Sequence, residues 1–254
     1  MKKIILLGLA FVALISGLFW FVSQVNQDDL VLKETITVQN PQFTQGFVWD
    51  NKTNQLLLGS GLYGQSVLAT FQFDQKTWQI KDHLPSHAFG EGLALAGDDL
   101  WQITWKEQEA YRRDKETFDI KETVSYEGEG WGITYSSDDS HLIMSDGTNQ
   151  LQFRDPKDFS LLKSIPVTEK NKAVTNINEL EYANGFVYAN IWQTNFIVKI
   201  DPNSGKVVKR YDLTDLVETI SADVDVLNGI AHVEDDMFYI TGKMYPVIWK
   251  VELH

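Results

Sequence analysis

Four turns with one shared pattern recur along the chain at nearly regular intervals. In each turn an Asp ends an apolar stretch, and a few polar residues follow before the next apolar one. Asp suits a tight turn because its carboxylate accepts hydrogen bonds from nearby backbone N–H groups. The four residues, Asp74, Asp114, Asp155 and Asp201, are 40, 41 and 46 positions apart. This period indicates one supersecondary unit repeated along the chain.

A second series of short motifs runs in phase with these turns, and each motif opens an apolar stretch. The residues that follow alternate in polarity and are rich in β-branched and aromatic types, which favours strand over helix. Units of about 40–50 residues with four strands each are typical of propeller blades. The openings are Gln45-Gly-Phe, Glu91-Gly-Leu, Trp131-Gly-Ile, Leu180-Glu-Tyr and Asn228-Gly-Ile. Five openings predict an all-β, five-bladed β-propeller of four-stranded blades, with one short helix near 213–219.

The fifth unit is incomplete at the C-terminus, because Val247–Leu253 supplies its third strand and the chain then ends. The segment Lys33–Val38 resembles Lys121–Tyr126, which is expected to be the fourth strand of the second unit. We therefore expect the N-terminal strand to complete the last blade. This closure leaves no open sheet edge on which chains could aggregate.

The N-terminus carries Lys2 and Lys3 followed by an apolar run from Ile4 to Val22. This run is longer than most signal-peptide cores and close to the length that spans a bilayer. No clear cleavage site is present, and a chain without cysteine cannot be attached as a lipoprotein. We expect residues 1–26 to be a membrane-anchoring segment and 27–254 to be a propeller domain outside the cytoplasm. The alternative is a cleaved signal and a secreted or periplasmic protein.

Composition removes several classes of function. The formal charge of −13 argues against a basic surface for nucleic acid, and an acidic surface of this kind chiefly favours solubility. The absence of cysteine removes disulfides, a thiolate nucleophile and Cys-ligated zinc. The five histidines lack metal-site spacing, and neither a phosphate-binding loop nor a nucleophile elbow is found.

The repeat phase also predicts a site, because the inner strands of a propeller face one central channel. Residues that open these strands, and residues at which the second strand turns back, are expected to meet at one mouth. Simpler roles stay open: the Trp residues can be core packing, Glu91 can form an ion pair, and Lys243 can extend to solvent. Asp146-Gly is more typical of a hairpin turn. The converging set is Phe43, Gln45, Phe89, Glu91, Trp131, Asn178 and Asn228, with Trp105, Asp146, Trp192 and Lys243.

These residues lie within nine short strings that span about residue 43 to the C-terminus. The strings are Phe43-Thr-Gln-Gly46, Gly61-Leu-Tyr-Gly64, Phe89-Gly-Glu-Gly92, Glu129-Gly-Trp-Gly132, Leu142-Ile-Met-Ser-Asp-Gly147, Asn178-Glu-Leu-Glu-Tyr182, Ala189-Asn-Ile-Trp-Gln-Thr194, Asp225-Val-Leu-Asn-Gly229 and Thr241-Gly-Lys243. Each string alone is weak evidence. Their ordered set resembles the glutaminyl cyclase family of plants and bacteria, the type exemplified by the papaya enzyme.

The resemblance implies an acyltransferase that cyclises N-terminal glutamine to pyroglutamate and releases ammonia. It implies no metal or cofactor in catalysis, and it raises the expectation of a structural Ca²⁺. The partners would be peptides or proteins with N-terminal glutamine, the membrane would be contacted through the N-terminal segment only, and we expect a monomer. Carried over by position, the catalytic residues are Glu91, Lys243, Asn178 and Gln45. The substrate-binding residues are Phe43, Phe89, Trp105, Trp131 and Trp192.

The chemistry of this reaction fits such a site. The substrate supplies its own nucleophile, the α-amine, and its own electrophile, the γ-carboxamide, so the enzyme need only position them and move protons. We assign the proton shuttle to Glu91. Two alternatives remain: a non-catalytic propeller that binds ligands at the cell surface, and a metal-dependent, six-bladed lactonase-like propeller.

Overall fold

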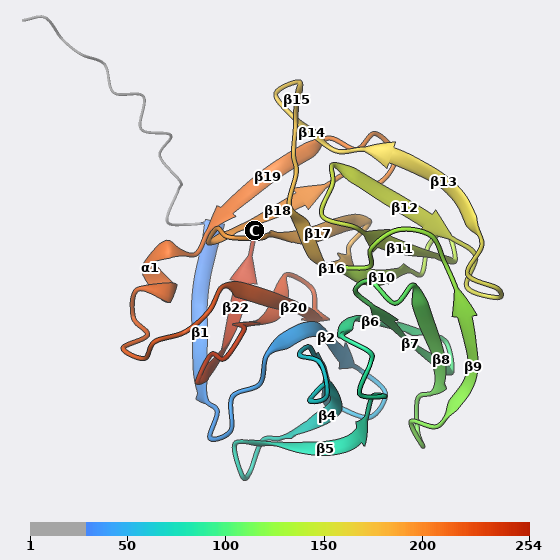
Figure 1. The fold of residues 1–254 in the computed structure, drawn as a ribbon. Coiled ribbons are helices and arrows are strands. Elements are labelled where there is room, and N and C mark those ends of the chain that lie inside the picture. Colours follow the sequence, from blue (N-terminus) through green and yellow to red (C-terminus); the bar gives the residue numbers. More distant parts are fainter. Residues whose placement is uncertain (1–28) are drawn as a thin grey trace, which may run out of the picture.

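A computed structural model describes residues 29–254 of the chain. It contains five antiparallel four-stranded sheets around a central axis (Figure 1). The strands, grouped by blade and in sheet order, are β2 (Thr44–Asp50), β3 (Gln55–Ser60), β4 (Val67–Gln72) and β5 (Thr77–His83); β6 (Gly90–Ala96), β7 (Asp99–Thr104), β8 (Glu109–Asp114) and β9 (Ile120–Ser125); β10 (Ile133–Ser136), β11 (His141–Ser145), β12 (Gln150–Arg154) and β13 (Leu161–Pro166); β16 (Ile177–Ala183), β17 (Phe186–Ile191), β18 (Phe196–Ile200) and β19 (Val207–Asp212); and β20 (Leu227–Glu234), β21 (Met237–Gly242), β22 (Val247–Leu253) and β1 (Leu30–Thr37). The predicted five-bladed propeller is confirmed. Five blades argue against the six-bladed lactonase alternative.

The ring closes as the sequence predicts, because the N-terminal strand β1 forms the outer strand of the last blade. It pairs antiparallel with β22, from Leu30 opposite Leu253 to Thr37 opposite Val247. The inner strands β2, β6, β10, β16 and β20 contact one another in that order, and β20 returns to contact β2. In Figure 1 these strands lie nearest the axis, whereas β9, β13, β19 and β1 lie at the periphery.

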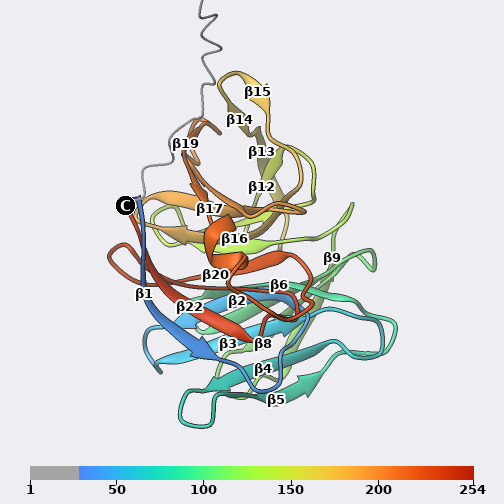
Figure 2. The ribbon, with the colours of Figure 1, turned by 90° about the vertical axis from the view of Figure 1, so that its left-hand side faces the viewer.

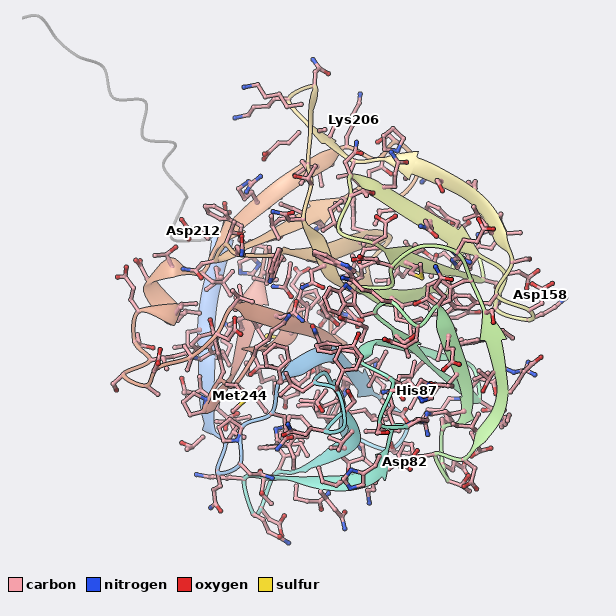
Figure 3. All side chains as sticks on the ribbon, in the orientation of Figure 1. Asp82, His87, Asp158, Lys206, Asp212 and Met244 are labelled. Atoms are coloured by element: carbon pink, nitrogen blue, oxygen red, sulfur yellow. The ribbon has the colours of Figure 1, made fainter. Side chains whose placement is uncertain are left out.

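Burial follows position within each blade. The inner strand β2 is buried along nearly its whole length, whereas the outer strands β9 and β13 are mostly exposed. Side chains fill the space between the ribbons of the ring (Figure 3), and some aromatic side chains contact the neighbouring blade. Trp101 of the second blade, for example, packs on Phe159 of the third with ring centroids 5.0 Å apart. Aromatic side chains therefore pack both within blades and between them.

The recurring Asp turns behave as predicted in three blades. The carboxylates of Asp114, Asp155 and Asp201 each accept a hydrogen bond from the backbone N–H two residues later, at 2.9, 2.8 and 2.9 Å. No hydrogen bond of the described residues uses the Asp74 side chain. The turn motif thus closes the outer hairpin of three blades by the expected interaction.

Two local features lie outside the blades. The predicted short helix is present as α1 (Thr214–Val217), between β19 and β20. A hairpin of β14 (Thr168–Glu169) and β15 (Lys172–Ala173) was not predicted, and it projects from the ring in Figures 1 and 2. Its strands are two residues long, so no alternation of polarity could reveal them. Its turn residues Lys170 and Asn171 both have positive φ, at 50° and 64°.

The fourth blade opens two residues earlier than the sequence analysis placed it. Equivalent bulges precede Leu93 in β6, Leu180 in β16 and Ile230 in β20. The opening of the fourth blade is therefore Asn178-Glu-Leu and not Leu180-Glu-Tyr. The error arose because Glu179 stands where the other four blades have glycine, so the Gly signal is missing there.

The expected anchor, residues 1–26, lies outside the described residues. Within residues 29–254, none of the helices has the length and apolar character required to cross a bilayer.

Candidate active site

One pocket brings together all nine residues predicted for the site. Its cavity volume is about 250 Å³. The lining residues are Phe43, Gln45, Phe89, Glu91, Trp105, Trp131, Asn178, Trp192 and Lys243, together with Asp225. The roles assigned to them individually stay predictions, but their convergence in one cavity is a property of the fold.

Irregularities in the backbone explain why these side chains meet in one cavity. Gln45, Glu91 and Asn178 each lie at the β-bulge that interrupts pairing at the start of an inner strand. A bulge changes the direction in which side chains point and is often found beside active sites. The second set follows the ends of β7, β17 and β21, and supplies Trp105, Trp192 and Lys243.

Glu91 is the buried carboxyl group of the pocket. Only 5% of its surface is exposed, and burial raises its pKa well above the ordinary glutamate value. Lys243 opposes this shift, whereas the negative charges of Glu107 and Glu129 add to it. A carboxyl group with a raised pKa is a stronger base, which suits proton transfer near neutral pH.

Lys243 is the buried cation of the pocket. Its side chain is 5% exposed, and burial lowers the pKa of the ammonium while Glu91 and then Asp225 raise it. Its Nζ lies 4.9 Å from the ring centroid of Phe43, a geometry typical of a cation–π interaction. The site therefore holds one buried carboxyl group and one buried cation among aromatic side chains.

Gln45 forms a hydrogen bond with Glu91, and Asn228 in turn forms hydrogen bonds with Gln45 and its neighbour Thr44. Gln45 Nε2 donates to Glu91 Oε1 at 3.1 Å. Asn228 is fully buried and donates through Nδ2 to the carbonyl of Thr44 at 3.0 Å and to Gln45 Oε1 at 3.4 Å. Asn228 thus lies behind Gln45 and does not line the pocket. Asp146 does not line it either, since its carboxylate bonds Thr148 in a turn, as the sequence favoured.

Aromatic rings form the pocket walls in two groups. Phe89 contacts Phe43 and Trp105 edge-to-face, with centroids 6.3 and 5.5 Å apart. On the other side, Trp131 and Trp192 are perpendicular to each other at 5.4 Å. Such pairs are stabilised by more than their buried area, and they exclude water from Glu91.

Several polar groups of the pocket take part in no hydrogen bond among residues 29–254. They include Glu91 Oε2, the side-chain amide of Asn178, Lys243 Nζ and the indole N–H of Trp192. Asn178 is only 2% exposed, but its amide atoms are not among the fully buried polar atoms that lack a partner, so they can be reached from the pocket. These groups are therefore available to a ligand that carries both hydrogen-bond donors and acceptors.

The sequence analysis missed two acidic residues of this region. Asp225 lines the pocket but lies in the loop between α1 and β20, where the insertion interrupts the repeat phase. Glu129 lies behind the pocket, and its carboxylate contacts two of the wall residues. Both residues occur in the short strings quoted from the sequence. Glu129 lies two positions before Trp131 and Asp225 three before Asn228, and this closeness in sequence was the signal that could have identified them.

The described residues offer few ligands for a metal ion. Within 29–254, no group of three or more His, Asp or Glu side chains is arranged to hold an ion. Glu179 on the inner strand β16 is fully buried. One of its carboxylate oxygens accepts the N–H of Ile230 at 2.9 Å, and the other has no partner among the described residues. A single carboxylate with one free oxygen supplies few of the six to eight ligands that Ca²⁺ takes. The structural Ca²⁺ stays an expectation.

Comparison with known proteins identifies the family of the chain. The sequence matches the glutamine cyclotransferase family over residues 12–253. It is 31% identical over 217 residues to a glutaminyl-peptide cyclotransferase of Arabidopsis thaliana, covering 83% of this chain and 67% of that protein. The family match begins within the apolar N-terminal run, earlier than the strings from residue 43 indicate.

Solved structures extend the likeness to three dimensions. The crystal structure of Myxococcus xanthus glutaminyl cyclase is similar with a TM-score of 0.79 at 30% identity, covering 88% of this chain and 95% of that one. A Bacteroides thetaiotaomicron protein of unknown function, 12% identical with a TM-score of 0.55 over 84% of this chain and 70% of that one, shares the fold alone. On the family match across nearly its whole length, the chain belongs to the glutamine cyclotransferase family.

Proposed function

We propose that this chain is a glutaminyl-peptide cyclotransferase that converts N-terminal glutamine to pyroglutamate, with Glu91 as the proton shuttle. The observation that supports this most directly is the set of unpartnered groups on Glu91, Asn178 and Lys243 inside one aromatic pocket. The carboxamide of a glutamine side chain has two N–H donors and one acceptor oxygen. It can therefore donate to the carboxylate of Glu91 and accept from Lys243 or Asn178. Family membership supports the same reaction.

The pocket would act first by shaping the substrate. The α-amine and the γ-carboxamide must approach each other for a five-membered ring to form, and a free side chain rarely adopts that shape. Walls made by Phe89, Trp105 and Trp192 would hold the chain folded. The two reacting groups already belong to one molecule, so the gain comes from holding the side chain in this near-attack shape and is only a part of what positioning contributes to reactions between separate molecules.

Glu91 would then move the proton that the reaction must relocate. Its carboxylate takes a proton from the amine as the nitrogen attacks the amide carbon, and a tetrahedral intermediate forms. The resulting carboxylic acid gives that proton to the departing nitrogen, and the C–N bond breaks to release ammonia. The raised pKa of Glu91 favours the first transfer, and the second returns the carboxylate to its starting state.

The oxygen of the attacked amide gains negative charge in this intermediate. Lys243 and Asn178 are the proposed donors to that oxygen, since neither side chain has a hydrogen-bond partner among the described residues. Gln45 has one amide hydrogen on Glu91 and a second that remains available. Preorganised donors of this kind typically contribute about 10²–10³-fold each to the rate.

The setting of the enzyme follows from the same proposal. The apolar run from Ile4 to Val22 supports a location outside the cytoplasm, anchored by residues 1–26 or released after cleavage. The partners would be peptides or proteins that present N-terminal glutamine. We also propose a monomer, since β1 completes the last blade within the same chain and no blade lacks a strand that a second chain would have to supply.

The test is cyclisation of a synthetic peptide with N-terminal glutamine, followed by mass spectrometry for the loss of one ammonia. The same peptide with an acetylated N-terminus should be inert because its nitrogen is no longer nucleophilic. A peptide with N-terminal asparagine should also be inert, because its side chain is too short to form the five-membered ring. Activity on the acetylated peptide, or none on the free one, would refute the proposal.

A further inference from the structure

The carboxylate of Glu129 binds two pocket walls at once from outside the pocket. Its Oε2 accepts the indole N–H of Trp105 at 2.8 Å and the indole N–H of Trp131 at 3.0 Å. Trp105 follows the second strand of the second blade, and Trp131 opens the third blade. One oxygen atom therefore joins side chains from two blades.

The two indoles belong to different halves of the aromatic wall. Trp105 packs edge-to-face on Phe89 with centroids 5.5 Å apart, and Trp131 packs in the same way on Trp192 at 5.4 Å. The distance between the halves decides how much room a side chain has between them. Glu129 is the hydrogen-bonded link between the halves, because its single oxygen meets an indole from each.

The backbone next to Glu129 is constrained, whereas its side chain is 42% exposed and is held by its hydrogen bonds and an ion pair. The N–H of Gly130 donates to the carbonyl of Trp105 at 2.9 Å. A Cβ at Gly130 would lie 2.6 Å from the carbonyl oxygen of Thr104, so only glycine fits this close approach. Lys106 holds the other side of the carboxylate: its Nζ lies 3.8 Å from Oε1 and 3.8 Å from the ring centroid of Trp105.

We propose that Glu129 is a positioning residue that sets the width of the glutamine pocket by holding Trp105 and Trp131 in a fixed relation. It does not line the pocket and would not touch the substrate. Because both indole N–H groups are committed to Glu129, these two rings serve as walls and not as donors to the substrate. The proposal rests on the pocket being the glutamine site.

The test compares Glu129→Gln with Glu129→Leu. Gln keeps an acceptor oxygen for the two indoles, whereas Leu removes it and leaves both N–H groups unpaired. We expect Glu129→Leu to lower kcat/KM by about 10–100-fold, since misplacement of about 1 Å in a site costs up to that much. Glu129→Gln should retain kcat/KM within about threefold, as expected when the acceptor geometry survives. The matched control is Glu127→Leu, an exposed residue two positions earlier whose carboxylate takes part in no described hydrogen bond or ion pair.

A second readout needs no substrate. In ¹H–¹⁵N spectra of the indole N–H groups, Glu129→Leu should shift two resonances that Glu127→Leu leaves in place. The proposal fails if the Leu variant folds normally with unchanged kcat/KM, if Gln and Leu lose activity equally, or if no indole resonance moves. Because the indole shifts are read without turnover, they separate this proposal from the proposed function: shifted indoles in a protein that never cyclises glutamine would refute only the latter.

Discussion

Gln45 Nε2 donates a hydrogen bond of 3.1 Å to Glu91 Oε1, and both side chains are almost fully buried. The two residues are 46 positions apart and open the inner strands of neighbouring blades. The bond fixes one oxygen of the carboxyl group and leaves Oε2 free of partners among the described residues. This arrangement suits the proposed proton shuttle, because Gln45 holds one oxygen in place while the other is available to exchange the proton.

Replacing Glu91 by Gln should abolish turnover while folding persists. Gln keeps the size of the side chain and an oxygen that can accept from Gln45, but it cannot carry a proton between two nitrogens. Loss of a general acid–base group typically costs about 10²–10⁴-fold in rate. The measurement is kcat on an N-terminal glutamine peptide, with thermal melting as the check on folding. Glu127→Gln is the matched control, and retention of more than about half of wild-type kcat in Glu91→Gln would contradict the shuttle.

The pH dependence of kcat should report the carboxyl group of Glu91. Activity should rise with pH because the base must be ionised, and the acid limb should lie above the ordinary glutamate range because burial raises the pKa of Glu91. The charged groups that act on Glu91 are Lys243, Glu107 and Glu129, and only Lys243 lowers its pKa. Using kcat rather than kcat/KM excludes the titration of the free substrate amine, whose pKa is about 7.7–8.0.

Removing Lys243 should therefore change both rate and pH profile. Lys243→Met is expected to lower kcat by about 10²–10³-fold through the loss of an oxyanion donor. It should also move the acid limb to higher pH, since the cation that favours ionised Glu91 is gone. Lys243→Arg retains the charge and should keep the limb near its original position. An acid limb that moves to lower pH in Lys243→Met would mean that another group titrates.

Glu181 should make the propeller less stable as pH rises. Burial raises its pKa to about 8 in the folded protein, whereas an unfolded Glu titrates near 4.3. A raised folded pKa means that stability is fully present below the unfolded pKa and is lost as pH rises toward the folded one. Glu181→Gln keeps the acceptor for the N–H of His232, at 2.9 Å in the wild type, and removes the titration.

The free energy of unfolding of Glu181→Gln, minus that of the wild type, should therefore grow between about pH 5 and pH 8. The expected rise is on the order of a few kcal/mol, from about 1.4 kcal/mol per pKa unit. Denaturant titrations at several pH values measure it. A difference that stays constant over this range would show that Glu181 is ionised in the folded protein at every pH tested.

Chelation should leave catalysis intact. No histidine lines the pocket and the chain has no cysteine, and these are the side chains that most often hold catalytic zinc. We expect prolonged dialysis against EDTA to leave kcat unchanged, while the melting temperature reports on any structural ion. Loss of kcat that added zinc alone restores would contradict this expectation.

The repeat in the sequence was sufficient to predict the blades, the closing strand and a converging set of eleven residues. The family resemblance reduced this set to the nine that line the pocket, since Asn228 and Asp146 do not line it. Periodicity works here because each blade is a meander of short strands joined by local turns, so local sequence carries most of the topology. It failed at Glu179, where a buried carboxyl group replaces the expected glycine, and at the β14–β15 hairpin, whose strands are too short to show a period. Residues 1–26 lie outside the described residues, so the anchor stays a prediction.

The sequence by itself determined which residue types stand at which phase of the repeat, and hence that indoles, amides, Glu91 and Lys243 would gather at one mouth. Only the tertiary structure decided their electrostatics and partners. The raised pKa of Glu91 depends on burial by several blades, and the commitment of two indoles to Glu129 depends on how the second and third blades meet. Burial and contacts between blades depend on residues that are far apart in the sequence, so no local sequence pattern predicts them.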